Sequence, residues 1–228
     1  MTDPLRASLT ERLVAMRGDT GDELPPALLD IAAETVDSLT IVAPRDWDEL
    51  RHQEGAEGRH IPYWARIWPS GMALVDFLAT RDLAGLRVLE LGCGLGLASA
   101  AAAKAGANVL ATDRSPDAVV FTAHNLALNE LEGEVALVDW REPRLLLDGA
   151  PWDLVIAADV LYTHQAVDTL LRLLPKLTRR PGGQVLLADP SRAGCRDFLA
   201  AARASFAVET HPDPARERVN VHVLTRRA

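Results

Sequence analysis

A glycine-rich stretch at residues 90–96, Glu-Leu-Gly-Cys-Gly-Leu-Gly, most constrains how this 228-residue chain can fold. It follows an apolar run at residues 88–91 and precedes an alanine-rich segment. Glycine permits backbone conformations that other residues avoid, and it lets the main chain come close to a ligand. The stretch therefore predicts a turn from a strand to a helix in an α/β fold, where such folds hold a nucleotide-like cofactor. An ordinary strand-to-helix turn is the simpler alternative.

The spacing of the glycines narrows the kind of cofactor. A dinucleotide-binding loop has the pattern G-x-G-x-x-G, but the third residue after Gly94 is Leu97. Gly92, Gly94 and Gly96 instead follow an acid, Glu90, which stands two residues before the first glycine. This pattern resembles motif I of the seven-stranded, Rossmann-like methyltransferases. The resemblance implies S-adenosyl-L-methionine as the cofactor and S-adenosyl-L-homocysteine as its product.

Composition limits the class of protein. With 48% hydrophobic and 25% charged residues, the chain can form one compact core. A net charge of −8 argues against a partner bound through phosphates, such as nucleic acid. No apolar run approaches the roughly 20 residues of a membrane span, and the first residues lack a secretion signal, so we expect a cytoplasmic protein. Two cysteines, Cys93 in the predicted cofactor loop and Cys195, suit a reducing compartment, and the six histidines show no metal-ligand spacing.

From residue 71 onward, apolar runs of strand length alternate with longer helical patterns, as in a doubly wound sheet. The predicted strands are 87–91, 108–112, 134–138, 153–158, 184–188, 206–210 and 219–225, and the predicted helices are 71–79, 97–105, 116–129 and 165–177. The last two strands are joined by a loop and predict an antiparallel hairpin. The sequence thus predicts an α/β, Rossmann-like, seven-stranded methyltransferase sheet, mostly parallel, with helices on both faces.

The N-terminal residues show two helical patterns. Residues 4–16 carry leucines at helical spacing and predict an amphipathic helix that ends near Gly18. A second helix is predicted to begin at Pro25-Pro26, since proline is tolerated in a first turn, and to bury apolar side chains as far as Ala32.

The next segment is expected to join this helical part to the sheet. Residues 39–42 predict a short strand, and the polar, glycine-containing stretch 51–60 predicts a mobile connector. We therefore expect two parts. Residues 1–60 form an N-terminal helical extension and connector packed on the core, and residues 61–228 form the methyltransferase domain.

Acidic and aromatic residues follow the predicted strands at the edge of the sheet where cofactors bind. Asp113 follows the second strand, 21 residues after Gly92, where a carboxylate can accept both ribose hydroxyls. Asp139 and Trp140 follow the third strand, where an acceptor can take the adenine amino group and an indole can cover the ring. Glu90 is placed to bind the ammonium of the methionine moiety. The structural alternative for Asp113 is an ordinary acid at a helix N-terminus, and the structural alternative for Trp140 is a tryptophan that fills the core.

The acceptor side of the site is expected beyond the fourth strand, which leads into Asp159 and Tyr162. An acid and a phenol three residues apart can orient an incoming amine, which must lose its proton before its lone pair attacks. Asp189 and Arg192 follow the fifth strand, where Arg192 can bind an acidic group of a substrate. Trp68 precedes the sheet and can close over the pocket. The structural alternative for Asp159 and Tyr162 is a helix cap followed by a buried tyrosine. The structural alternative for the segment from Asp189 to Arg192 is an ordinary turn.

Four motifs together resemble those of the seven-stranded protein-lysine methyltransferases of the methyltransferase 16 group. They are motif I at 90–96, the D-x-x-Y run at 159–162, the Asp-Trp pair at 139–140 and the Trp-Pro-x-Gly segment at 68–71. The likeness is strongest to the electron-transfer-flavoprotein β-subunit lysine methyltransferases. It rests on Pro-Tyr-Trp-Ala at 62–65, Trp-Pro at 68–69, Asp-Pro-x-Arg at 189–192 and the region 39–47.

The resemblance implies methyl transfer to a lysine side chain of a protein, with the electron-transfer flavoprotein β subunit as a candidate. It places Asp159 and Tyr162 at the lysine channel, and Trp64 is assigned to the substrate side. It assigns to the cofactor Trp68, Glu90, Gly92, Asp113 and Trp140. Three other functions stay open: a small-molecule N-methyltransferase similar to nicotinamide N-methyltransferase, an NAD-dependent oxidoreductase, and a non-catalytic module that keeps the cofactor site.

Overall fold

A seven-stranded β-sheet organises the protein, whose computed structural model describes residues 4–17 and 24–228. The strands lie in the order β5-β4-β3-β6-β7-β9-β8. Their bounds are Arg87–Leu91 (β3), Asn108–Asp113 (β4), Glu134–Leu137 (β5), Leu154–Ala158 (β6), Gln184–Asp189 (β7), Phe206–Pro212 (β8) and Asn220–Arg226 (β9). Strands β3 to β7 pair in parallel, and β9 pairs antiparallel with both β7 and β8. The predicted α/β sheet with its C-terminal antiparallel hairpin is confirmed.

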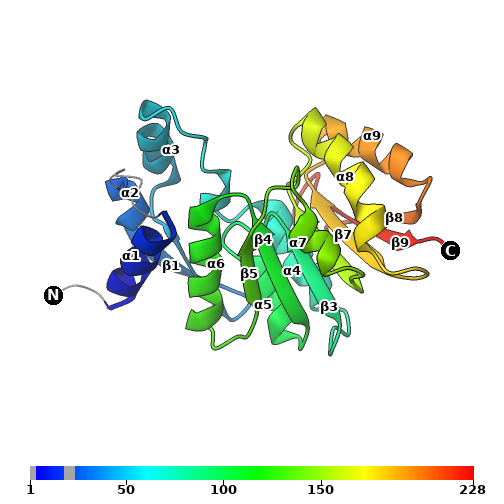
Figure 1. Cartoon of the computed structure of the whole chain (residues 1–228), viewed down its shortest axis with the longest axis horizontal. Helices are drawn as coiled ribbons and strands as arrows, with labels where there is room; N and C mark the ends of the chain where they lie inside the picture. Colours follow the sequence, from blue (N-terminus) through cyan, green and yellow to red (C-terminus); the bar gives the residue numbers. More distant parts are fainter. Residues whose placement is uncertain (1–3, 18–23) are drawn as a thin grey trace.

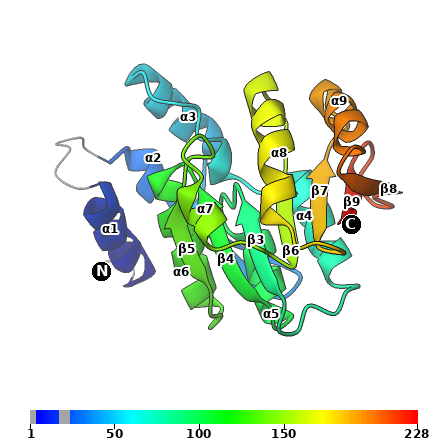
Figure 2. The same ribbon diagram turned by 45° about the vertical axis from the view of Figure 1, so that its right-hand side comes forward.

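Helices cover both faces of this sheet (Figure 1, Figure 2). One face carries α4 (Pro69–Leu78), α5 (Leu97–Lys104) and α6 (Pro116–Leu128), and the other carries α7 (Arg144–Asp148), α8 (His164–Leu177) and α9 (Ala193–Ala202). Successive side chains of a strand point to opposite faces, so Val88 packs in the core under α4 to α6 and Leu89 in the core under α8 and α9. Because both faces are covered, the central strands are apolar along nearly their whole length.

Local signals in the sequence fix where two of these helices begin. The hydroxyl of Ser115 accepts a hydrogen bond from a backbone N–H in the first turn of α6, and Pro116 is the first helical residue. Thr163 caps α8 in the same way. The buried residues of α8 recur at helical spacing. They are Val167, Leu170, Leu173, Leu174 and Leu177.

The first predicted helix is confirmed as α1 (Pro4–Arg17), which packs on α6. Leu9 and Leu13 are fully buried and join the core that α4 and α5 share. Met16 is 37% exposed and lies at the edge of the cavity described below. The predicted cap at Gly18 lies outside the described residues.

The second predicted helix is wrong beyond its first turn. Helix α2 covers only Pro26–Leu29, and Ile31 and Ala32 belong to β1 (Ile31–Val36), which pairs antiparallel with β2 (Leu39–Pro44). Asp37 and Ser38 have φ of 45° and 62°, which makes the two-residue turn that the twist of a hairpin requires. The predicted strand at 39–42 is confirmed within β2.

The connector predicted at residues 51–60 is wrong for most of its length, because α3 covers Trp47–Ala56. Asp46 caps this helix by accepting a hydrogen bond from the backbone N–H of Glu49 at 2.9 Å. Leu50 and Glu54 are buried on one side of it. The cap and the single leucine decide the conformation despite the polar composition.

The sequence reasoning gave no helix for two segments, α7 and α9. Helix α9 buries Cys195, Phe198 and Ala202, which are spaced three and four residues apart, so the signal was present. Helix α7 is a single short stretch that buries Leu146. In the described ranges 4–17 and 24–228, no helix has the length and apolar character needed to cross a membrane.

Candidate active site

A cavity of about 820 Å³ opens at the carboxyl ends of β3, β4 and β6. Parallel strands bring their carboxyl ends to one edge of a sheet, so residues distant in sequence meet there. The predicted site residues that line it are Trp64, Trp68, Glu90, Gly92, Cys93, Gly94, Asp113, Asp139, Trp140, Asp159 and Tyr162. Gly96, Asp189 and Arg192 are not among the residues that line it. Among residues 4–17 and 24–228, no three His, Cys, Asp or Glu side chains come together as metal ligands.

Three residues in the left-handed region shape the glycine loop between β3 and α5. Gly92, Gly94 and Gly96 have φ of 77°, 55° and 78°. A Cβ on Gly96 would lie 2.7 Å from Cγ2 of Thr122, and one on Gly94 would lie 3.1 Å from the carbonyl oxygen of Trp64. All three positions therefore need glycine for backbone conformation, and Gly96 also needs it for space. Gly96 supports the loop from behind, where it packs on α6.

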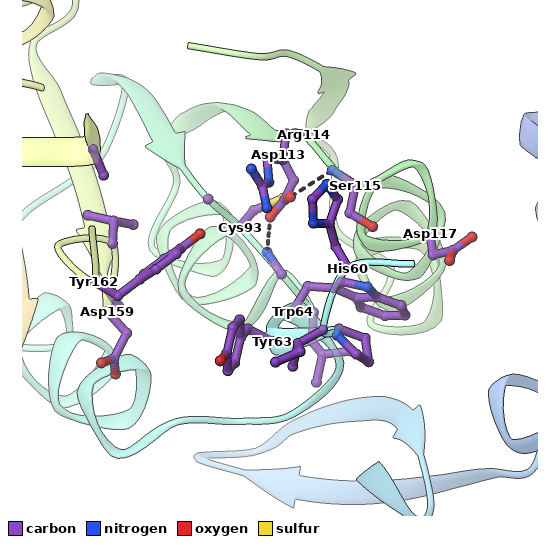
Figure 3. A pocket seen from close by; sticks show the side chains of 18 of the residues that line it. His60, Tyr63, Trp64, Cys93, Asp113, Arg114, Ser115, Asp117, Asp159 and Tyr162 are labelled. Carbon is purple, nitrogen blue, oxygen red and sulfur yellow. Dashed lines mark hydrogen bonds between the residues drawn. The ribbon is translucent and has the colours of Figure 1, made fainter. Parts of the chain in front are cut away.

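Asp113, the last residue of β4, organises the same loop. Its carboxylate accepts hydrogen bonds from the backbone N–H of Gly94 at 3.0 Å and of Ser115 at 2.9 Å (Figure 3). Burial raises the pKa of this carboxyl above its ordinary value, and the backbone donors oppose that shift. The acid stands beside the loop at the cavity wall. Its contact with a ribose stays a prediction.

Glu90 is an acid almost completely enclosed by the fold. Its side chain is 3% exposed and accepts a hydrogen bond from the hydroxyl of Ser99 on α5. Burial raises the pKa of Glu90 to about 8, against the opposing effect of the Ser99 hydrogen bond. Near neutral pH the carboxyl is therefore mostly protonated, and a cationic ligand beside it favours the ionised form.

Asp139 and Trp140 follow β5 and line the cavity together. The guanidinium of Arg141 binds the Asp139 carboxylate, with Nε 2.9 Å from Oδ2. These hydrogen bonds from Arg141 lower the pKa of Asp139 to about 2. A Cβ on Gly92 would lie 3.7 Å from the ring of Trp140, so the indole stands beside the glycine loop. The pair supplies a charged acceptor next to a flat apolar surface.

The two tryptophans before α4 have different surroundings. The ring of Trp64 packs against Phe121 of α6 with centroids 5.1 Å apart. Trp68 donates its indole N–H to the carbonyl of Tyr63 at 2.8 Å, and the guanidinium of Arg66 lies 4.6 Å from its ring centroid. Trp64 thus lies against the glycine loop, whereas Trp68 lies at the rim of the cavity. The substrate contact of Trp64 and the cofactor contact of Trp68 stay predictions.

A tyrosine that the sequence reasoning gave no role, Tyr63, faces Tyr162 at the mouth of the cavity. Their ring centroids are 5.9 Å apart, and both side chains are about half exposed. Burial of the phenol raises the pKa of Tyr162 above its ordinary value. In Figure 3 Tyr162 stands across the cavity from Asp113 and Ser115. The two phenol rings therefore pack on each other and form an aromatic wall of the cavity.

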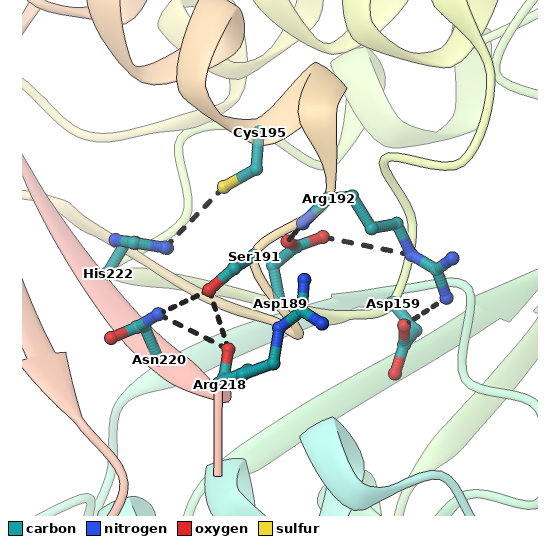
Figure 4. Close-up of polar contacts among 8 residues, drawn as sticks. All are labelled: Asp159, Asp189, Ser191, Arg192, Cys195, Arg218, Asn220 and His222. Carbon is teal, nitrogen blue, oxygen red and sulfur yellow. Dashed lines mark hydrogen bonds and ion pairs between the residues drawn. The ribbon is translucent and has the colours of Figure 1, made fainter.

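Asp159 directly follows β6, and its backbone adopts the left-handed conformation, with φ of 57°. Nη2 of Arg192 donates to its Oδ1 at 2.6 Å, and the backbone N–H of Arg192 donates to Oδ1 of Asp189 at 2.7 Å (Figure 4). Asp189 is fully buried, and this burial raises its pKa. Asp189 and Arg192 thus hold Asp159 from behind. Their direct contact with an acceptor, predicted from the sequence, stays a prediction.

Two asparagines were also not identified from the sequence: Asn125 on α6, and Asn129 directly after the end of that helix. The side-chain nitrogen of Asn125 donates to the carbonyls of Val42 at 3.1 Å and Leu95 at 2.8 Å, and its oxygen accepts from the N–H of Val42 at 2.8 Å. Asn129 binds the N–H and carbonyl of Thr40 at 2.8 and 2.7 Å. Helix α6 thereby joins β2 to the glycine loop. Asn125 and Asn129 are one helical turn apart and so share one side of the helix, but this spacing does not indicate which backbone groups they bind.

Comparison with known proteins decides the family of this fold and site. Residues 48–203 match Methyltransf_16, a family described as lysine methyltransferase. The chain belongs to this family. The protein N-lysine methyltransferase METTL21A of Danio rerio is 36% identical over 169 residues, which are 70% of this chain and 75% of that protein. The predicted resemblance to the methyltransferase 16 group is confirmed.

Other relatives of this lysine methyltransferase family member are longer. The electron transfer flavoprotein beta subunit lysine methyltransferase of Danio rerio is 37% identical over 139 residues, covering 60% of this chain and 53% of that protein. The chain thus spans about half the length of that relative. Among solved structures, the T. Thermophilus 16S rRNA N2 G1207 methyltransferase RsmC, in complex with AdoMet and guanosine, has a TM-score of 0.65 at 16% identity, covering 86% of this chain and 50% of that chain. That likeness shows the shared fold.

Proposed function

We propose that this family member transfers a methyl group from S-adenosylmethionine to a lysine side chain of another protein. One observation carries the proposal: a single cavity joins a glycine loop with two buried acids, Glu90 and Asp113, to an acid–tyrosine pair, Asp159 and Tyr162. The first set suits a sulfonium cofactor with an ammonium and a ribose. The second suits an amine acceptor. Membership of the lysine methyltransferase family supports both halves.

The cavity lining fits the chemical groups of this cofactor. Glu90 would hold the ammonium of the methionine part, Asp113 the ribose hydroxyls, and Asp139 with Trp140 the adenine. The protonated Glu90 carboxyl ionises when a cation is placed beside it, which replaces the proton by an ion pair. Bound there, the cofactor supplies an electrophilic methyl group on sulfur. The chain needs no nucleophile of its own.

The acceptor half holds and orients a lysine. The carboxylate of Asp159 would bind the ammonium, while the paired rings of Tyr63 and Tyr162 offer an apolar surface to the stem of the side chain. The amine gives its proton to water before its lone pair takes the methyl group. Asp159 therefore acts by orientation and needs no role as a strong base.

We propose a protein acceptor, and the electron transfer flavoprotein β subunit is the first candidate because several relatives carry that name. The purified chain is incubated with isotope-labelled S-adenosylmethionine and either this subunit or a cell lysate, and the products are digested and sequenced by mass spectrometry. Label on lysine residues of a protein is expected. Label confined to small molecules would contradict the protein acceptor and favour a small-molecule N-methyltransferase.

Substitution of Asp159 tests the division of the cavity. Asp159→Ala is expected to lower kcat/KM by about 100-fold or more, because the acceptor loses its orienting charge. The affinity for S-adenosylhomocysteine, measured by calorimetry, should stay within about threefold of the original protein. Asp148→Ala, at an exposed acid of α7, is the matched control and should leave both quantities unchanged. Full turnover by Asp159→Ala would refute the assigned role.

A further inference from the structure

The acid of the acceptor half is already paired with a cation of its own chain. Arg192 binds Oδ1 of Asp159 at 2.6 Å, and no other described residue donates a hydrogen bond to the Asp159 carboxylate. The side chain of Asp159 is 9% exposed and that of Arg192 is 37% exposed. An acceptor ammonium would therefore meet a carboxylate with one oxygen, Oδ2, still to be bound and with part of its charge already balanced.

The segment that carries Arg192 is fastened to the sheet on its other side. The backbone N–H of Arg192 donates to the buried Asp189, whose Oδ2 also lies 4.0 Å from Nε of Arg192. The hydroxyl of Ser191, a left-handed residue with φ of 62°, donates to the carbonyl of Arg218 at 2.6 Å. Asn220 on β9 donates to the same hydroxyl at 2.9 Å (Figure 4). The ion pair is thus held by the fold, unlike an ordinary surface pair.

Several charged or titratable groups lie near this pair. Asp189 at the end of β7 and Tyr162 before α8 interact with its charges, and Cys195 of α9 lies beside Asp189. Asp113 at the end of β4, Arg114 after it and Tyr63 of the 3₁₀ turn Tyr63–Ala65 lie around Tyr162. Within the described chain, Arg192 is the cation that contacts Asp159 directly. It is therefore the cation whose charge an ammonium on Asp159 would feel most strongly.

We infer that Arg192 is a positioning residue that acts through Asp159 to make the bound acceptor amine easier to deprotonate. The inference rests on the proposed methylation of a lysine amine. A lone carboxylate would stabilise the ammonium and delay loss of its proton, because an opposite charge favours the charged form. Arg192, on the far oxygen of the same carboxylate, opposes this stabilisation by like-charge repulsion. The acceptor would be held in a fixed direction by Oδ2 and give its proton to water. Its lone pair would then take the methyl group as the methyl–sulfur bond breaks, with the bonding electrons left on the sulfur of S-adenosylhomocysteine.

The test is the pH profile of kcat, measured from pH 6 to 10 with the acceptor protein that the labelling experiment identifies. For Arg192→Gln, the acid limb of the profile should move up by about one pH unit, since solvent screening reduces the full effect of the charge. At pH 7.5, kcat should then fall about tenfold, while KM for the acceptor falls because the ammonium binds an unopposed carboxylate. Arg192→Met, of similar length and also neutral, should shift the limb equally. Arg192→Lys keeps the charge and should stay within about 0.3 pH unit of the original protein.

Two controls separate this effect from loss of structure. Each variant should bind S-adenosylhomocysteine within about twofold of the original protein. Ser191→Ala weakens the fastening of the segment but keeps the charge, so its acid limb should not move. An unmoved limb in both neutral variants, a limb moved equally by Arg192→Lys or Ser191→Ala, or loss of cofactor binding in both neutral variants would each overturn the inference. If the original protein labels no protein lysine, the proposed function itself fails, and the inference fails with it.

Discussion

The cavity has a proposed cofactor half, around Glu90 and Asp113, and a proposed acceptor half, around Asp159 and Tyr162. The two halves are held in place by different kinds of contact. In the cofactor half, Asp113 is held by backbone N–H groups and Glu90 by a hydroxyl of α5, and both acids are buried. In the acceptor half, Asp159 is held by a long side chain, and the rings beside it are about half exposed. Groups bound to the backbone move only when the fold moves, whereas exposed side chains can adopt other rotamers.

This difference suggests that the cofactor half is rigid and tied to stability, while the exposed rings of the acceptor half can adapt to a partner. Substitutions in the cofactor half should change the free energy of unfolding and cofactor affinity together. Substitutions in the acceptor half, such as those at Asp159 and Arg192, should change kcat and the KM for the acceptor but leave stability and cofactor affinity nearly unchanged. Four predictions test the cofactor side of this comparison.

Gly96→Ala is expected to have the largest effect. The left-handed backbone costs about 1–2 kcal/mol for a residue with a Cβ, and the contact with Thr122 at 2.7 Å adds about 1–3 kcal/mol of overpacking. The free energy of unfolding in urea should fall by about 2–5 kcal/mol, and cofactor binding should be lost. Gly85→Ala is the matched control, because Gly85 has φ of 73° and no atom within 4 Å of its would-be Cβ. Equal losses at the two positions would break the link between loop packing and stability.

Glu90 should make stability and cofactor affinity respond to pH in opposite directions. Its folded pKa of about 8 lies above the ordinary value of 4.5, so the folded chain keeps a proton that the unfolded chain has released. Without cofactor, the free energy of unfolding should fall by about 2 kcal/mol between pH 6 and 8. Cofactor affinity should rise over the same range, because the ionised carboxylate binds the ammonium. Glu90→Gln, compared by urea unfolding and calorimetry, should flatten both dependences; a slope retained in this variant would assign the effect to another group.

Asn125 on α6 and Asn129, which caps the end of that helix, offer a matched pair. Both bind β2, but only Asn125 also binds the glycine loop, through the carbonyl of Leu95. Asn125→Ala and Asn129→Ala should each lower the free energy of unfolding by about 1–2 kcal/mol, through buried groups left without partners. Only Asn125→Ala should also weaken cofactor binding, by about tenfold, measured at a temperature where both variants are folded. Equal affinities for the two variants would show that the loop holds its shape without α6.

Arg141→Ala is expected to have the smallest effect. The ion pair between Arg141 and Asp139 is exposed, and such pairs contribute little to stability. The midpoint of thermal unfolding should not change measurably. Cofactor affinity should improve by less than about threefold, because Asp139 no longer divides its oxygens between Arg141 and the adenine. A large loss of affinity would mean that Arg141 itself contacts the cofactor.

Features that depend on a few neighbouring residues were readable from the sequence. The glycine loop, the apolar strands and the Ser115-Pro116 start of α6 are local patterns, and the structure has each where it was predicted. The same holds for the acids at strand ends, because the edge of a parallel sheet gathers them whatever the details of packing. This is why most of the cofactor half could be predicted.

Features that depend on contacts across the chain were missed. Asn125 reaches Val42, 83 positions away, and no local pattern announces that contact. The pairing of Tyr63 with Tyr162 likewise requires the whole sheet to be in place. In α3, one buried leucine and a cap outweighed a polar composition, and at Ile31 a tight turn converted an expected helix into a hairpin. The acceptor half, built mainly of such contacts, was correspondingly hard to predict.

The asparagine contacts along β2 also bear on how the chain avoids aggregation. A two-stranded sheet leaves backbone N–H and C=O groups open at its outer edges, and such edges can recruit strands of other molecules. On β2 the groups of Thr40 and Val42 that face outward are taken by α6 side chains. On β1 the exposed Glu34 places a charge beside the other edge. The helix that supports the glycine loop thereby also closes one edge to intermolecular strand pairing.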